Sequence, residues 1–187
     1  MVPLKFETFF LASSGASAAL IGLLFVAVSI APERVFGAAA PTVRQAQALS
    51  AFTALANVFF ISMASLVPSI QIGAVVTIIA IPASLQTLAL LALVKQWREQ
   101  RIMYRGAVLF LGSALIYAFE LYLGIQLWRG PVNSAALTGL LELILGAYAI
   151  GLGRAWELLG APRFGFLMNV FALLPRAREP KPPRTGS

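Results

Sequence analysis

The sequence of 187 residues contains no cysteine, no histidine and no aspartate, and all seven of its acidic residues are glutamates. The absence of cysteine excludes disulfide bonds and thiolate chemistry, and without cysteine or histidine the usual zinc ligands are missing. No Ser-His-Asp or Cys-His arrangement can be built from this composition. We therefore expect no enzymatic activity, no metal and no cofactor.

Charge is also scarce, since only 11% of the residues are charged while 59% are hydrophobic. A typical soluble domain has about 25% charged residues. A folded soluble chain of this length leaves roughly 30% of its surface exposed, so it could not hide this much apolar surface. The composition excludes the soluble and the disordered classes and indicates an integral membrane protein.

Long uncharged runs predict where the chain crosses the membrane, because about 20 apolar residues span the hydrocarbon layer. Residues 8–32 give one span, and residues 45–94 give two that separate near Pro68. Residues 106–128 and 134–156 give two more, joined by a turn at Gly130 and Pro131. We predict an all-α bundle of five transmembrane helices over 1–161, a short cytoplasmic interfacial helix over 162–175 and a disordered basic tail over 176–187.

The basic residues predict the orientation of the bundle. With five spans, twelve of the 14 lysines and arginines fall on one side of the membrane and two on the other. Cytoplasmic loops carry the excess of Lys and Arg, which places the N-terminus outside and the C-terminus in the cytoplasm. The net charge of +7 is thereby explained by topology, without a nucleic-acid partner.

Two glutamates inside predicted spans are the main candidates for function, because an ionisable group in a membrane is costly and usually functional. Glu120 and Glu142 lie eleven residues before and after Pro131, so an antiparallel hairpin places them at one depth. Mutual repulsion and burial disfavour two ionised carboxylates, and we expect at least one to be protonated at neutral pH. The alternative is a neutral glutamate that hydrogen-bonds within the bundle and only stabilises it.

Three further polar residues, Asn57, Thr77 and Ser17, fall near the depth of these glutamates in three other spans. Such a layer could line a hydrated ion path, or it could consist of interhelical hydrogen bonds worth about 0.6–2 kcal/mol each. The sequence leaves both interpretations open.

Small residues predict close helix packing. Glu142 shares a helical stripe with three glycines, so we expect it to face protein or a cavity and not lipid; the glycines are Gly139, Gly146 and Gly153. In the first span, Gly15 and Ala19 have the spacing of a packing motif, either within one subunit or between subunits.

Three arginines, Arg98, Arg101 and Arg105, lie in the short loop between the third and fourth predicted spans. Their side chains could bind lipid phosphate or an anionic partner. Orientation of the bundle alone also accounts for them.

Residues 12–34, which include the run GASAALIGLLFVAVSI from position 15, resemble the first span of a group of small uncharacterised bacterial multi-span membrane proteins. The resemblance covers about one eighth of the chain. It implies a location in the bacterial inner membrane, and it transfers no activity and no functional residue.

Three classes of function follow from these features. The first is a homo-oligomeric pore or ion-conducting channel with the intramembrane glutamates at its conduction or gating layer. The second is a non-catalytic accessory subunit or modulator of a larger membrane complex. The third, a membrane-embedded enzyme or lipid-binding protein, would have only the two glutamates as acid–base groups. The expected partners are membrane lipids, further copies of the chain, or an unlike membrane protein.

Overall fold

The computed structural model describes residues 4–93, 95, 98, 103–130 and 133–158, and every regular element among them is a helix. Five helices are long and apolar enough to cross a membrane, as predicted. The expected tail segments 162–175 and 176–187 lie outside the described residues. The elements are α1 (Leu4–Ile30), α2 (Glu33–Phe36), α3 (Thr42–Ser65), α4 (Ile72–Ala89), the short 3-10 helix η1 (Leu90–Leu93), α6 (Met103–Arg129) and α7 (Ser134–Leu158).

Local sequence explains where these helices begin and end. The predicted break near Pro68 is confirmed, since α3 ends at Ser65 and α4 begins at Ile72. Ser69 in this turn has a φ of 64°, a left-handed conformation that reverses the chain. At the start of α7, the side-chain oxygen of Asn133 accepts hydrogen bonds from the backbone N–H groups of Ala135 and Ala136 at 2.7 and 3.1 Å. Such a cap satisfies donors that have no partner inside the helix.

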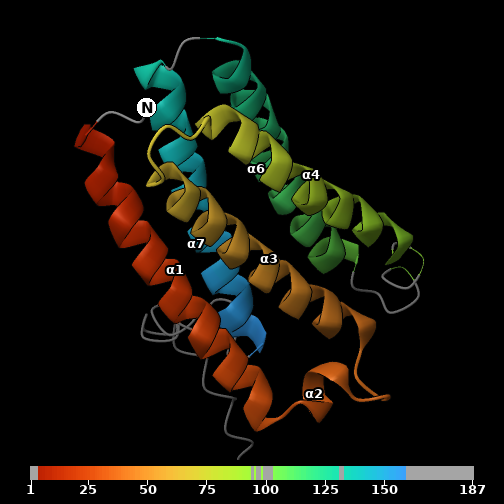
Figure 1. Ribbon diagram of the computed structural model, residues 1–187. Coiled ribbons are helices and arrows are strands. Elements are labelled where there is room, and N and C mark those ends of the chain that lie inside the picture. Colours follow the sequence, from red (N-terminus) through yellow and green to blue (C-terminus); the bar gives the residue numbers. More distant parts are fainter. Residues whose placement is uncertain (1–3, 94, 96–97, 99–102, 131–132, 159–187) are drawn as a thin grey trace, which may run out of the picture.

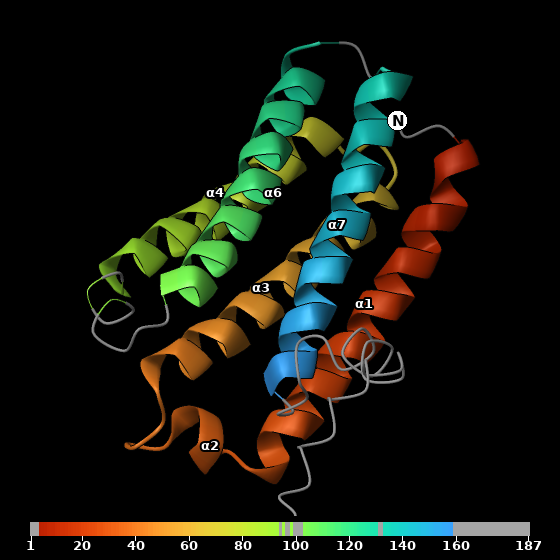
Figure 2. The same cartoon turned by 180° about the vertical axis from the view of Figure 1, so that it is seen from behind.

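Helix α3 is the centre of the arrangement, because it packs against α1, α4 and α7. Helix α6 packs against α4 and α7, so α3, α4, α6 and α7 form a closed ring of four helices in which α3 and α6 lie on a diagonal. Helix α1 lies outside this ring against α3, with little contact to α7 (Figures 1 and 2). A side chain that joins α3 to α6 must therefore cross the interior of the ring.

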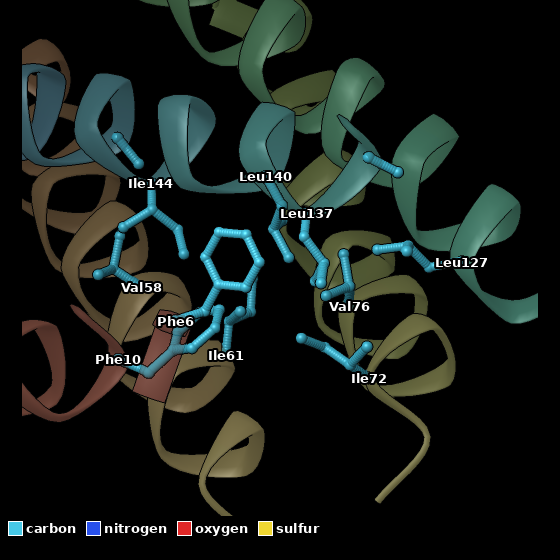
Figure 3. Packing of buried hydrophobic residues seen from close by; sticks show 12 residues of the cluster. Phe6, Phe10, Val58, Ile61, Ile72, Val76, Leu127, Leu137, Leu140 and Ile144 are labelled. Carbon is cyan, nitrogen blue, oxygen red and sulfur yellow. The ribbon is translucent and has the colours of Figure 1, made fainter. Parts of the chain in front are cut away.

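The two ends of the bundle differ in composition. We name the end formed by residues 31–42 and the last turn of α7 the α2 end, and the end with the turns at residues 66–71 and 130–133 the Ser69 end. Buried apolar side chains from all five long helices form one cluster (Figure 3). Most of its members lie in the halves of their helices nearer the Ser69 end. Its largest fully buried members are Phe10, Ile61, Leu137 and Leu140.

Many large apolar side chains remain exposed on the outside of the bundle, among them Leu23, Phe25, Leu115 and Phe119. Exposed apolar faces on helices of this length are what a hydrocarbon solvent favours. The chain is accordingly a helical protein of the multi-pass membrane type.

Glycine allows α4 and α6 to approach each other closely at two points. A Cβ atom at Gly73 would collide with the backbone of Leu127 and Trp128. A Cβ atom at Gly124 would lie 2.7 Å from the hydroxyl of Thr77. Neither position tolerates a side chain without separating the two helices.

The glycines that the sequence singled out behave differently from one another. Positions 139 and 146 face α6, since a Cβ atom at Gly139 would lie 3.3 Å from Leu123 and one at Gly146 would lie 3.5 Å from Ile116. Gly15 and Gly153 have no such neighbour within 4 Å among the described residues, and Ala19 is exposed. In the part of the chain that the structure describes, these last three residues do not pack helices together, so for them only the prediction of packing between chains remains.

Candidate intramembrane polar site

The Glu120 carboxyl group is enclosed in the interior of the four-helix ring. Glu120 is 2% exposed and lies on α6, and Asn57 on α3 is 4% exposed. The side-chain amide of Asn57 donates to both carboxyl oxygens, at 2.9 Å to Oε1 and 3.0 Å to Oε2. The predicted proximity of these two residues is therefore observed, and their contact spans the α3–α6 diagonal.

Glu120 is near the middle of the Phe110–Arg129 span. At 1.5 Å per residue, Glu120 is about 15 Å along the helix axis from Phe110 and about 14 Å from Arg129, the two ends of that span. The contacts of Gly139 with Leu123 and of Gly146 with Ile116 set the register of α7 against α6. In that register Glu142 and Glu120 lie at the same height along the bundle, as predicted from their equal distance in sequence from Pro131.

The direction in which Glu142 points differs from the prediction. Its side chain is exposed on the outside of α7, and among the described residues it has no hydrogen-bonding partner. Gly139 and Gly146 contact α6, but successive residues rotate by about 100° around a helix axis, which places Glu142 about 40–60° to one side of both. That rotation carries it out of the α6–α7 contact, so one chain does not bring the two carboxyl groups together.

Thr77 and Ser17 are buried, but their hydroxyl groups are bonded within their own helices. The Thr77 hydroxyl donates to the Gly73 carbonyl at 2.7 Å. The Ser17 hydroxyl donates to the carbonyls of Ser13 and Ser14, at 2.7 and 3.0 Å. The structure therefore does not join either residue to Glu120 by a hydrogen bond, and the expected polar layer reduces to Asn57 and Glu120.

A buried arginine also lies in the interior, and the sequence did not predict it as a site residue. Arg154 on α7 is 7% exposed. Its guanidinium donates to the hydroxyl of Ser50 on α3, and it donates at 2.8 Å to the hydroxyl of Ser113 on α6. This side chain thus connects three of the four helices of the ring.

Further polar groups lie between the arginine and the glutamate and toward the α2 end. Tyr117 is 3% exposed and lies one turn before Glu120 on the same face of α6. Toward the α2 end, the Gln47 amide donates to Glu157 at 2.8 Å. We call this set the polar column: Gln47, Ser50, Asn57, Ser113, Tyr117, Glu120, Arg154 and Glu157.

A signal for part of the polar column is present in the sequence. Gln47, Ser50 and Asn57 lie on one face of α3, and Ser113, Tyr117 and Glu120 repeat at intervals of four and three on α6. On α7, the buried positions recur every three or four residues and end with the arginine; they are Leu137, Leu140, Ile144, Ala147, Gly151 and Arg154. Extending that stripe would have placed Arg154 in the interior.

A separate polar contact joins α1 to the ring. The Ser62 hydroxyl on α3 donates to the Ser13 hydroxyl on α1 at 2.9 Å, and the Ser13 hydroxyl lies 3.0 Å from the Tyr148 hydroxyl on α7. These groups satisfy one another, and none of them bonds to the polar column. They hold α1 against the ring.

Of the loop arginines, only Arg98 has a described side chain, and it is exposed. Arg101 lies outside the described residues, and nothing is described of the Arg105 side chain. An exposed Arg98 is compatible with binding to lipid phosphate, which stays a prediction.

No protein-family model, no curated protein and no solved structure matches this chain. The candidate site therefore rests on its own geometry: a carboxyl group and an amide at mid-span, and a guanidinium bonded to two serines nearer the α2 end.

Proposed function

We propose that the protein conducts an ion across a membrane, that the ion is a proton, and that Glu120 binds it at the middle of the membrane. The observation that carries this proposal is the nearly complete burial of the Glu120 carboxyl beside the Asn57 amide. Intramembrane carboxyl groups that face a bundle interior are typical of proton relays.

The chemistry of the pair suits a proton. A carboxylate accepts hydrogen bonds only, whereas a protonated carboxyl group both donates and accepts. An asparagine side chain offers a donor and an acceptor, so after rotation of its amide it could bond either form of Glu120. The Asn57 side chain could therefore remain bonded while Glu120 gains and loses a proton.

The orientation and setting belong to the same proposal. The α2 end carries Arg34 and Arg44, and the loop after η1 carries Lys95 and Arg98. By the positive-inside rule this end faces the cytoplasm and the N-terminus faces outward. The resemblance of the first span supports a location in the bacterial inner membrane.

An assembly of several copies is the second part of the proposal. Glu142 is exposed at mid-span, where a charged group facing lipid costs at least about 2.5–3.5 kcal/mol. A neighbouring copy that covers this side chain would avoid that cost. The same exposed residue supports the alternative function, an accessory subunit of a larger membrane complex, in which an unlike protein covers it.

Proton flux into liposomes tests the conduction proposal directly. Purified protein is reconstituted with a pH-sensitive dye inside, and a potassium gradient with valinomycin supplies the driving potential. We expect Glu120→Gln, which keeps the size but cannot ionise, to lower the flux at least ten-fold. The matched control is Glu7→Gln, the same change at an exposed residue near the start of α1.

The control is expected to conduct like the wild type. If Glu120→Gln conducts as well as Glu7→Gln, Glu120 is not on the path. Recovery of an unlike protein in fixed stoichiometry from native membranes, with no flux from the isolated chain, would support the accessory-subunit alternative.

A further inference from the structure

We propose that in the observed conformation Glu120 exchanges its proton only with the side of the α2 end, that the polar column is the route, and that release toward the Ser69 end requires a second conformation. This inference rests on the proposed function, since it assigns a direction of access to the same carboxyl group. It follows from the difference between the two halves of the ring interior.

Between Glu120 and the α2 end, polar side chains follow one another through the ring. Tyr117 lies one turn from both Glu120 and Ser113 on α6, and the guanidinium of Arg154 bonds the hydroxyls of Ser50 and Ser113. The Gln47–Glu157 contact follows nearer the end of the bundle. Hydroxyl groups both donate and accept, so they can pass a proton or hold a bridging water.

Between Glu120 and the Ser69 end, the interior is filled with aliphatic side chains. Val58, Ile61, Val76, Leu137 and Leu140 are all fully or almost fully buried and belong to one cluster (Figure 3). Aliphatic groups neither donate nor accept hydrogen bonds, and a close-packed apolar interior excludes water.

The hydroxyl groups on this second side are already bonded elsewhere. Thr77 donates to Gly73, and Ser65 donates to the carbonyl of Ile61 at 2.7 Å. Ser62 donates to Ser13, toward α1 and away from the ring interior. Toward the α2 end a proton at Glu120 has exchangeable side chains as well as the buried apolar Leu55 and Ile144, whereas toward the Ser69 end the cluster offers no exchangeable group.

A buried charge also marks the Arg154 half of the interior. A charge in a membrane interior is costly unless it is paired or hydrated. Arginine keeps its proton at all relevant pH values, so Arg154 stays charged and positions the serine hydroxyls. The proton itself moves through the hydroxyls and the water between them.

The absence of cysteine from the chain allows a direct test of access. Single cysteines are introduced into the full chain in membrane vesicles and exposed to a membrane-impermeant methanethiosulfonate that carries a sulfonate. Ala39→Cys and Ser134→Cys, both at exposed positions, mark the α2 side and the Ser69 side. Ser113→Cys reports on the polar column, and Ser62→Cys is the matched control at a buried serine outside it. The modified fraction is read by mass spectrometry.

We expect Ser113→Cys to react at least ten times faster than Ser62→Cys when the reagent is on the side where Ala39→Cys reacts. From the side where Ser134→Cys reacts, neither buried cysteine should be modified. A Ser113→Cys rate equal to that of Ser62→Cys, or modification from the Ser134 side, would overturn the inference.

Ser50→Cys, on another helix of the polar column, repeats the measurement if Ser113→Cys does not fold. No proton gradient is applied in this experiment. One-sided reactivity without conduction would leave the access route standing and refute the proposed function. Conduction without one-sided reactivity would refute the access route and leave the proposed function standing.

Discussion

At the scale of single residues, the contact between Glu120 and Asn57 shows how a carboxyl group is accommodated far from water. A single amide serves both carboxyl oxygens, and no other hydrogen bond to them is found among the described residues. A buried acceptor that loses its partner costs about 1–3 kcal/mol, whereas replacing both partners by apolar groups can be nearly neutral. The stability of the pair therefore depends on both members being present.

This asymmetry gives a prediction for a double-mutant cycle. Asn57→Leu alone should lower the free energy of unfolding by about 1–3 kcal/mol, because the carboxyl loses its donor. Glu120→Met combined with Asn57→Leu should recover most of that loss. Unfolding in mixed micelles, followed by circular dichroism, measures all four proteins. Additive effects of the two substitutions would show that the residues are not coupled.

The sequence predicted the level of Glu120, Asn57 and Glu142 but not the direction of every side chain. Depth follows from counting residues from a turn, and Pro131 made that count possible. Direction depends on the rotation of each helix against its neighbours, and the glycine stripe of α7 indicated it only to within about 60°. Because of that uncertainty, the sequence predicted that Glu142 faces protein or a cavity, whereas within one chain its side chain is exposed.

At the scale of helices, the sequence predicted the number of spans and the two hairpin turns because hydropathy reports the solvent of a whole segment. Which face of a span is buried is harder to predict. In a soluble protein the apolar face of a helix is the face that packs into the protein core. In a membrane protein the face toward lipid is equally apolar, so apolarity does not identify the buried face. Leu115 is exposed and Leu140 is buried, but the sequence alone does not distinguish these two leucines.

Close approach of α4 and α6 gives a prediction for two glycines in membrane-spanning helices. Gly73→Ala should destabilise the protein by about 1–3 kcal/mol, because the new methyl group meets the backbone of Leu127 and Trp128. Gly15→Ala should leave stability unchanged or raise it by up to about 1 kcal/mol, because Gly15 has open space and alanine is the better helix former. Thermal unfolding of both variants in detergent measures the difference. Equal melting temperatures would contradict the close contact.

At the scale of the whole molecule, two faces of the described helices remain uncovered, and the proposed assembly would form on them. The outer side of α7 exposes Glu142 and, one turn further, Leu145. Helix α1 exposes Gly15 and Ala19, a pair of small residues at the spacing used for helix contacts in lipid. Two such faces on one chain suit a membrane complex better than an isolated bundle.

Disulfide cross-linking tests whether a second copy covers the Glu142 face. Leu145→Cys should give a disulfide-linked dimer under mild oxidation in membranes, with a yield at least five times that of Leu111→Cys. The control is matched, because Leu111 and Leu145 are both 56% exposed and lie on different helices. Equal yields at the two positions would show that this face does not lie on a symmetric contact between copies.

The long sequence separations across the polar column have a consequence for biosynthesis. Asn57 and Glu120 are 63 residues apart, and Ser50 and Arg154 are 104 residues apart. At about 5–20 residues per second of translation, Asn57 leaves the ribosome roughly 3–13 s before its partner. The Asn57 amide of the nascent α3 therefore has no Glu120 to bond during that interval. Arg154, in the last helix of the bundle, is synthesised after both of its serine partners.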